Sequence, residues 1–309
     1  MDFRQLEYIL EIAKENNITR AAKNLFISQS ALNQQLLKLE QELGVQLFYR
    51  SRTNWHPTAA GEVYLDGARK AMHIRHDTYQ HIQDITKSEK SQLRLGLTPD
   101  RGIAMFTKIY ADLHHNYRKL MILPLEMPVR HQFRALYNGD IDIGFITIHE
   151  SQLGNDEYIH ICPEEIVIIL PKSHPLAKKA APPSEPLACL DLRLLSDEPF
   201  TLMYKSSTNR AICDNIFAAN GITPNIVMET STTDSIVSMV ETIHCCGLLP
   251  RYYMEGAKDR VASFVMPEHP TWDLYIMYRK NSYLSLANKE YIRLVKEFWN
   301  ETLPPVQTN

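Results

Sequence analysis

The chain has 309 residues, 44% of them hydrophobic and 22% charged, and its 33 basic and 36 acidic side chains give a net charge of −3. A chain of this length buries an ample core and predicts two or three domains in a soluble globular protein. The overall charge does not indicate a polyanionic partner. Residues 1–58 hold 7 basic and 6 acidic side chains, so any affinity of this part for a polyanion depends on where the basic groups are placed.

The amino-terminal segment and the cysteines indicate a reducing cytoplasm. Charged residues run through the first 17 positions, which therefore lack the apolar stretch of a signal peptide. No run approaches the roughly eighteen apolar residues of a membrane span, so no membrane association is expected. The cysteines are odd in number and lack CxxC spacing, which disfavours disulfides and zinc, with a redox switch kept as an alternative. They are Cys162, Cys189, Cys213, Cys245 and Cys246.

Two helix starts lie close together in the segment 18–44. Thr19 is expected to N-cap a short helix, and Ser28 a longer one, because both side chains accept backbone N–H groups at that position. Gly44 supplies the residue that ends the second helix. Its predicted buried stripe consists of Leu32, Leu36, Leu39 and Leu43, at spacings of 4, 3 and 4.

The opposite face of the second helix carries the side chains expected to contact DNA. Amides pair bidentately with adenine in the major groove, hydroxyls and ammonium groups reach phosphates, and a helix N-terminus favours an anion. The candidates are Gln29, Ser30, Asn33, Gln34 and Lys38. The segment therefore predicts a helix-turn-helix whose second helix reads DNA, with a plain helical hairpin as the alternative on spacing alone.

An ordered set of residues distinguishes these two interpretations. It comprises Ala21-Ala22, Ser28-Gln-Ser-Ala31, Leu39-Glu40, Leu43-Gly44-Val45, Leu47-Phe48, Arg50 and Thr58-Ala-Ala-Gly61. This order resembles the winged helix-turn-helix of LysR-type transcriptional regulators, and it implies a sequence-specific DNA-binding regulator. The sequence departs from the family pattern at Asn33, where Ser is common, at Gln34 and Leu37, where Arg is common, and at Thr53, where a wing Arg is common. These departures affect which operator is read.

Two short strands around residues 51–54 are expected to form the wing. Arg50 and Arg52 are candidate phosphate contacts there, and for Arg50 a structural pairing with Glu40 is an equal alternative.

From Thr58 onward, nearly thirty residues without proline predict one long helix with a narrow apolar stripe. That stripe consists of Ala60, Val63, Gly67, Ala71, Ile74, Thr78, Ile82 and Ile85. The most economical partner for it is a second copy of the chain, so we expect a homodimer or a homotetramer.

After a polar linker at 87–92, strands and helices alternate, which predicts a parallel sheet in an α/β domain. The first strands are expected at 93–98, 121–127 and 141–147, with Pro124 placing the second at an edge. A second set begins at 166–171 and 173–177. Several short motifs here resemble the effector domain of the same family, which is similar to type 2 periplasmic binding proteins and holds a ligand between two lobes. They are Leu136-x-x-Gly139-x-x-Asp142, His174-Pro175-Leu176, Phe217-x-x-x-Gly221, Leu248-Leu249-Pro250 and Leu284-Ser285.

We therefore predict an α/β chain in three parts. They are a winged helix-turn-helix DNA-binding domain at 1–58, a dimerising linker helix at 59–88 and a two-lobed effector-binding domain at 89–309. Lobe I is expected at about 93–163 and 268–301, and lobe II at about 164–267. One departure from the family is the approach to Leu248, where Ile243-His244-Cys245-Cys246-Gly247 lacks two expected glycines.

Ligands of open α/β sheets lie outside the carboxyl ends of strands, against helix N-termini. In lobe I this rule selects Thr98, Pro99, Asp100, Arg101 and Thr147. In lobe II it selects Tyr204, Lys205, Ser206, Ser207, Thr208, Thr230, Ser231, Thr232 and Thr233. The hydroxyls, the helix ends, Arg101 and Lys205 favour a small organic acid or similar anion, whereas Asp100 is expected to face an amine or to pair with Arg101. The alternative for Ser207 and Thr233 is that each is only an N-cap.

Other functions find less support in the sequence. No Gly-rich phosphate loop, GxSxG, HExxH or paired-acid motif occurs, so we expect no catalytic residue and no cofactor beyond a small-molecule co-inducer. His73, His76 and Asp77 share a helix face at metal-compatible spacing but lack a fourth ligand, so no metal is expected. The alternative function is a two-lobed small-molecule binding protein or enzyme domain with an accessory DNA-binding head. The expected partners are operator DNA, an effector and a second copy of the chain, and RNA polymerase is a further candidate.

Overall fold

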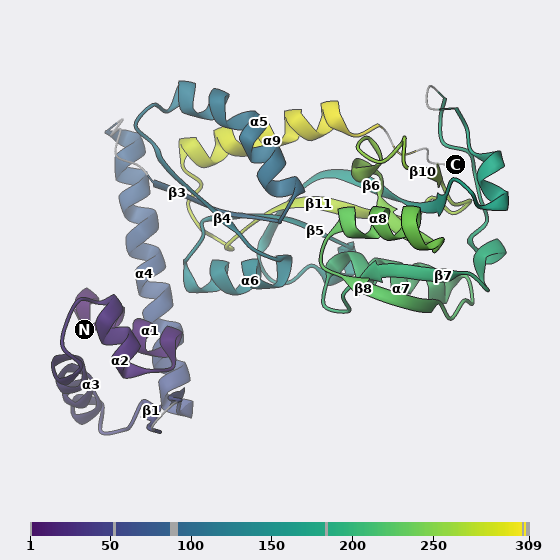
Figure 1. Ribbon diagram of the computed structural model, residues 1–309. Helices are drawn as coiled ribbons and strands as arrows, with labels where there is room; N and C mark the ends of the chain where they lie inside the picture. Colours follow the sequence, from purple (N-terminus) through teal and green to yellow (C-terminus); the bar gives the residue numbers. More distant parts are fainter. Residues whose placement is uncertain (1, 52–53, 87–91, 183–184, 305, 307–309) are drawn as a thin grey trace. The chain divides into compact units, whose positions relative to one another are not determined.

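The computed structural model describes residues 2–51, 54–86, 92–182, 185–304 and 306. The chain forms two compact units, coloured along the sequence in Figure 1. The amino-terminal unit contains the chain up to Ser91, with the short segments Tyr137–Asp140 and Ser282–Ser285. The carboxyl-terminal unit contains the rest. Among the described residues, no helix is long and apolar enough to cross a membrane.

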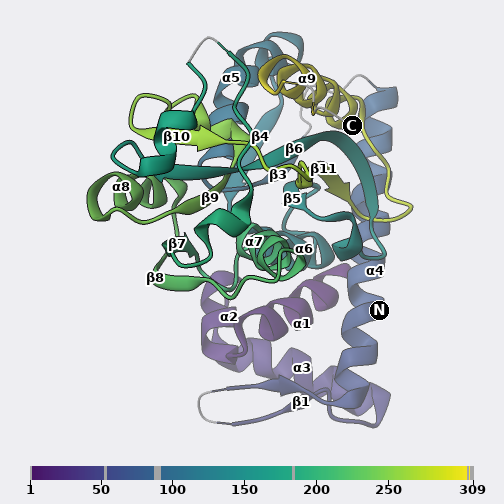
Figure 2. The same ribbon diagram turned by 90° about the vertical axis from the view of Figure 1, so that its right-hand side faces the viewer.

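The amino-terminal unit is a three-helix core followed by a small antiparallel wing and a long helix (Figure 2). Leu32 and Leu36 of the second predicted helix are fully buried, and they share a core cluster with Ile9 and Ile12 of the amino-terminal helix α1 (Phe3–Glu15). The predicted wing strands are present and antiparallel, with Phe48 opposite Pro57. The elements are α1 (Phe3–Glu15), α2 (Ile18–Asn24), α3 (Gln29–Leu43), β1 (Phe48–Tyr49), β2 (His56–Pro57) and α4 (Ala59–Ile85).

One of the two predicted N-caps in this unit is wrong. Asn17, and not Thr19, caps α2, because the Asn17 side-chain oxygen accepts hydrogen bonds from the backbone N–H of Thr19 at 2.9 Å and of Arg20 at 3.0 Å. The cap of α3 is confirmed, since Ser28 Oγ accepts from the backbone N–H of Ala31 at 3.1 Å. Asn and Ser are both strong N-cap residues, and the two asparagines before Thr19 carried this signal.

The ends of the helices also follow local chemistry. Gly44 ends α3 in the left-handed conformation, with φ 69°. Leu43, predicted to be buried, is 46% exposed because it is the last residue of the helix and the chain turns away there. Gly61 lies near the start of α4, where a Cβ would approach the Leu47 carbonyl oxygen to 2.0 Å, so only glycine fits.

The carboxyl-terminal unit is built on a mixed seven-stranded sheet, with α5 and α9 on one face and α6 on the other (Figure 1). The strand order is β10-β6-β11-β5-β3-β4, and β9 also pairs with β6. The elements are β3 (Gln92–Leu97), α5 (Arg101–Asn116), β4 (Met121–Glu126), α6 (Val129–Asn138), β5 (Ile143–Ile148), β6 (Glu157–Pro171), β7 (Pro199–Met203), α7 (Thr208–Ala219), β8 (Asn225–Thr230), α8 (Thr233–Ile243), β9 (Gly247–Pro250), β10 (Val261–Phe264), β11 (Thr271–Tyr278) and α9 (Leu286–Thr302).

In the seven-stranded sheet, the prediction of parallel strands is correct only for β4, β3 and β5. β4 lies at the edge, as Pro124 predicted. β11 runs antiparallel to both β5 and β6, and β6 runs antiparallel to β9 and β10. β6 is 15 residues long and passes through the predicted lobe limit at 163/164. The sequence indicated this strand only from 166, because Pro163, Glu164 and Glu165 interrupt its apolar pattern.

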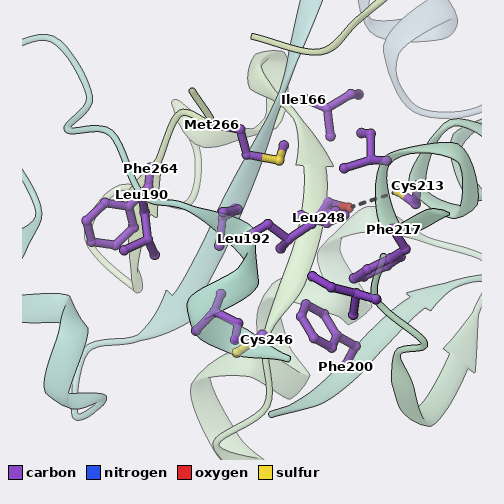
Figure 3. Close-up of a cluster of buried hydrophobic side chains, with 14 of the residues drawn as sticks. Ile166, Leu190, Leu192, Phe200, Cys213, Phe217, Cys246, Leu248, Phe264 and Met266 are labelled. Carbon is purple, nitrogen blue, oxygen red and sulfur yellow. Dashed lines mark hydrogen bonds between the residues drawn. The ribbon is translucent and has the colours of Figure 1, made fainter. Parts of the chain in front are cut away.

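A second hydrophobic core of the carboxyl-terminal unit lies beside the short parallel strands β7 and β8 (Figure 3). Phe200 of β7 and Phe217 of α7 meet edge to face, with ring centroids 4.9 Å apart. The Cys213 sulfur lies 3.9 Å from the Leu248 carbonyl oxygen. Residues 175–179, within the second predicted set, form a short 3₁₀ helix instead of a strand.

The segment 243–247, where two glycines common in the family are missing, still contains a left-handed turn. His244 ends α8 with φ 56° and ψ 43°, and its Nδ1 lies 2.9 Å from Ser173 Oγ. Cys245 and Cys246 then enter the core, where they are 0% and 1% exposed. A non-glycine residue therefore takes the backbone conformation for which glycine is favoured.

Candidate DNA-binding surface and ligand cavity

The outer face of α3 presents the amides predicted to read bases. Gln34 and Lys38 are exposed and Asn33 is half-buried. Gln29 and Ser30 are exposed but already have local partners. Gln29 Oε1 accepts a hydrogen bond from Thr19 Oγ1 at 2.9 Å, and Ser30 Oγ lies 3.0 Å from the hydroxyl of Ser28. Asn33, Gln34 and Lys38 therefore have the freer side chains.

Arg50 is engaged within the fold. Its guanidinium pairs with the buried carboxylate of Glu40, and the other Glu40 oxygen accepts from the backbone N–H of Leu47 at 2.8 Å. The same guanidinium lies 5.7 Å from the Trp55 ring centroid. The structure thus contains the pairing with Glu40, while a phosphate contact by Arg50 stays a prediction. Arg52 and Thr53 lie outside the described residues.

A cavity of about 220 Å³ lies in the carboxyl-terminal unit. It is lined by most of the residues that the strand-end rule selected: Thr98, Pro99, Asp100, Arg101, Thr147, Tyr204, Ser206, Ser207, Thr208, Thr230, Ser231 and Thr233. Lys205 and Thr232 were selected too, but they are outside its lining. The structure brings together segments that are more than a hundred residues apart in the sequence, and ligand contact by each residue stays a prediction.

The sequence interpretation missed other lining residues, among them Pro128, Val129 and Arg130 at the start of α6. They follow β4, so the rule that selected the ends of other strands would have found them had it been applied there. Asn209 was missed because it lies inside α7, and Trp272 because β11 enters the sheet from the far end of the chain.

Four helices begin at this cavity. Their first residues, Arg101 of α5, Val129 of α6, Thr208 of α7 and Thr233 of α8, all line it. Helix N-termini carry partial positive charge and free backbone N–H groups. The cavity is therefore positive in character before any charged side chain is considered.

The hydroxyl-rich turns before α7 and α8 contain helix N-caps as well as residues that line the cavity. Ser207 caps α7, accepting from the backbone N–H of Arg210 at 3.0 Å. Thr232 caps α8 by accepting from Ser235 at 3.2 Å, so the prediction of Thr233 as the N-cap is wrong by one residue. Ser207 serves as an N-cap and also lines the cavity, so one residue combines the two positions.

Arg101 is neutralised by an acid that the sequence did not suggest. It is 2% exposed, and its Nη1 donates to Glu164 Oε2 at 2.5 Å. Glu164 also accepts from the backbone N–H of Tyr252 and from Trp272 Nε1, both at 2.8 Å. Burial lowers the pKa of the guanidinium, but the Glu164 carboxylate and the Tyr253 side chain together more than offset this, so the pKa is raised overall. The predicted pairing of Arg101 with Asp100 is absent among the described residues.

Three buried polar atoms at the cavity lack a hydrogen-bond partner within the described part of the chain. They are Thr98 Oγ1, Arg101 Nη2 and Asn209 Nδ2. Leaving a buried donor unsatisfied costs about 1–3 kcal/mol. Two of these atoms are obligate donors and the third can donate, so the cavity is prepared for a group that accepts hydrogen bonds.

The cysteines do not favour redox chemistry. Burial raises the pKa of Cys162, Cys213 and Cys246 to about 12 and also raises the pKa of Cys189 and Cys245. The reactive form of cysteine is the thiolate, which these shifts disfavour. Within the described residues, no group of His, Cys, Asp or Glu side chains is arranged to hold a metal ion.

The chain is similar to known regulators over nearly its whole length. Residues 3–62 match the bacterial regulatory helix-turn-helix of the lysR family, and residues 86–300 match the LysR substrate binding domain. It is 30% identical to the HTH-type transcriptional regulator YwbI of Bacillus subtilis, across 96% of this chain and 97% of that protein. It is 25% identical to the probable cat1 operon transcriptional activator of Acinetobacter lwoffii, across 97% and 96%.

Solved structures show the same fold. A full-length OxyR variant from Pseudomonas aeruginosa matches with a TM-score of 0.70 and 22% identity, covering 96% of this chain and 94% of that one. Full-length CbnR in complex with its target DNA matches with a TM-score of 0.59 and 19% identity, covering 96% and 100%. The chain belongs to the LysR family of transcriptional regulators, with a DNA-binding helix-turn-helix and an effector-binding domain, and it is not an enzyme.

Proposed function

We propose that this regulator binds double-stranded operator DNA through α3 as a homodimer or homotetramer, and that a small organic ligand with a carboxylate or similar anion tunes it from the cavity. The set of unpartnered buried donors around the cavity carries the ligand part of this proposal. No further cofactor is required. RNA polymerase stays a candidate partner, and the divisions at 58 and 88 stay the proposed domain limits.

The apolar stripe of α4 supports assembly through this helix. Within the single chain, Val63 is 76%, Ile74 69%, Ile82 50% and Ile85 71% exposed. Such a row of aliphatic side chains on one helix face calls for a partner, and the same stripe of a second copy is complementary to it. Two DNA-binding heads would then contact two half-sites about one helical turn, or an integral multiple, apart.

Base reading is expected to depend on Gln34 and Asn33. Replacing either by alanine should weaken binding to specific DNA by about 1–3 kcal/mol if it contacts a base bidentately, with little change in non-specific binding. Fluorescence anisotropy with operator and unrelated duplexes measures both affinities. Gln35→Ala, at an exposed position of α3 off this face, is the matched control. A parallel loss on both duplexes would instead assign the residue to phosphate contact or to helix stability.

Several hydrogen-bond donors at the cavity support an anionic ligand. An anion at the cavity would meet four helix N-termini and the buried donors of Arg101 and Asn209. Lys205 lies outside the lining, and Arg130 supplies the exposed cation instead. The volume, about 220 Å³, is below the roughly 300–1,000 Å³ of sites for drug-sized ligands, which indicates a small molecule.

A thermal-shift screen of organic acids and amino acids on the full-length protein tests this placement. We expect at least one compound to raise Tm, and Thr98→Val and Ser206→Ala to reduce that shift, because both residues line the cavity. Thr107→Val, on the exposed side of α5, should leave the shift unchanged. Ligands whose shifts are the same in all three variants would place the effector elsewhere.

A further inference from the structure

The charged side chains around the cavity narrow the class of ligand, given the proposed function that an effector binds there. The lining contains three of them, Asp100, Arg101 and Arg130. Arg101 and Glu164 form a buried pair with no net charge. Asp100 and Arg130 remain, one of each sign, and both are exposed. Within the described chain, neither side chain has a hydrogen bond or an ion pair.

The Asp100 carboxylate does not cap its own helix, α5. Asp100 occupies the N-cap position of α5, where an aspartate normally accepts a backbone N–H of the first turn. Here it makes no such bond, and its backbone has φ 59° and ψ −86°. The Asp100 carboxylate therefore lines the cavity and can accept hydrogen bonds from a ligand.

A ligand with only one kind of charge fits this arrangement poorly. A simple carboxylate would satisfy Arg101 Nη2 and Asn209 Nδ2 but would meet Asp100 as a like charge. A simple amine would satisfy Asp100 but would face four helix N-termini and Arg130. A ligand that carries both groups satisfies both ends of the site.

Both binding groups come from one end of the same helix. Asp100 and Arg101 are consecutive residues at the start of α5, and both line the cavity. A ligand whose ammonium and carboxylate share one carbon atom is the simplest molecule that presents both charges to this end of the helix.

We propose that the effector is one of the twenty standard α-amino acids, bound with both of its charges. Its carboxylate accepts hydrogen bonds from Arg101 Nη2, Asn209 Nδ2 and the helix ends, and its ammonium donates to the Asp100 carboxylate. The side chain of the ligand lies against the remaining wall, which includes Tyr253 and Trp272.

The test compares pairs of compounds that differ only by the ammonium group, using full-length protein. All twenty L-amino acids are screened by thermal shift, and calorimetry then compares each that binds with the carboxylic acid of the same skeleton, such as leucine with 4-methylpentanoate. A hydrogen bond between charged groups corresponds to about a 10- to 100-fold difference in Kd in favour of the amino acid. Asp100→Asn should reduce this ratio to about threefold or less, because the amino acid loses its ion pair and the acid no longer meets a like charge. Asp112→Asn, at an exposed position of the same helix, should keep the full ratio.

Three results would overturn the proposal: carboxylic acids that bind as tightly as their amino acids, a preference that survives Asp100→Asn, or no binding by any of the twenty amino acids. An Asp100→Asn variant that loses both compounds alike would show a structural role and would also refute the ammonium contact. If acids bind and Thr98→Val weakens them, the cavity remains the effector site and only the amino-acid class is wrong.

Discussion

Glu164→Ala is expected to destabilise the carboxyl-terminal unit by about 3–5 kcal/mol, because it leaves the Arg101 guanidinium buried without a counter-ion. The Glu164 side chain is 0% exposed, and its loss also frees the backbone N–H of Tyr252 and the indole N–H of Trp272. Urea unfolding of the full-length protein, followed by tryptophan fluorescence, measures the change.

Two controls separate the buried charge from ordinary loss of a side chain. Glu255→Ala removes an exposed carboxylate paired with Lys258, and it should change stability far less than Glu164→Ala does because solvent screens the pair. The double variant Glu164→Leu with Arg101→Met replaces the pair by apolar side chains and should be clearly more stable than Glu164→Ala. If Glu164→Ala lowers the free energy of unfolding no more than Glu255→Ala does, Arg101 is solvated and its pairing with Glu164 does not stabilise the unit.

Ile74→Asp, alone or with Ile82→Asp, is expected to separate the protomers and to reduce affinity for operator DNA by about 10²–10⁴-fold. The charge would be buried in a helix-to-helix contact, and the loss of linked heads removes the gain from simultaneous binding at two half-sites. Analytical ultracentrifugation and gel retardation measure the two effects on the same samples.

The control for this experiment is Tyr79→Asp. Tyr79 is 60% exposed on α4 but lies off the stripe, so this variant should remain oligomeric and bind DNA normally. An Ile74→Asp protein that keeps its oligomeric state would show that α4 does not hold the protomers together.

The features that the sequence predicted well are those with local causes. Ser28, Gly44 and the start of α4 after Thr58 follow from capping chemistry within a few residues, and all three are confirmed. The cavity lining was largely predictable for a related reason. Strand ends and helix starts are visible in the sequence, and the ends of parallel strands meet at one edge of a sheet.

The features that the sequence did not predict depend on distant contacts. The sequence alone suggested a free cation at Arg101, because Glu164, its partner, is 63 residues away. The antiparallel strands β6 and β11 bring together the middle and the end of the chain, and nothing local specifies that pairing. Arg130 and Asn209 were missed for local reasons: the strand-end rule was not applied after β4, and Asn209 lies inside α7.

Footprinting of the full-length protein on the DNA beside its own coding region distinguishes sequence-specific recognition through α3 from non-specific binding. We expect two protected half-sites separated by about one helical turn or an integral multiple, lost in Gln34→Ala while weak non-specific binding remains. Protection that is equal on unrelated DNA of the same length, or unchanged in Gln34→Ala and Asn33→Ala together, would contradict sequence-specific recognition through α3.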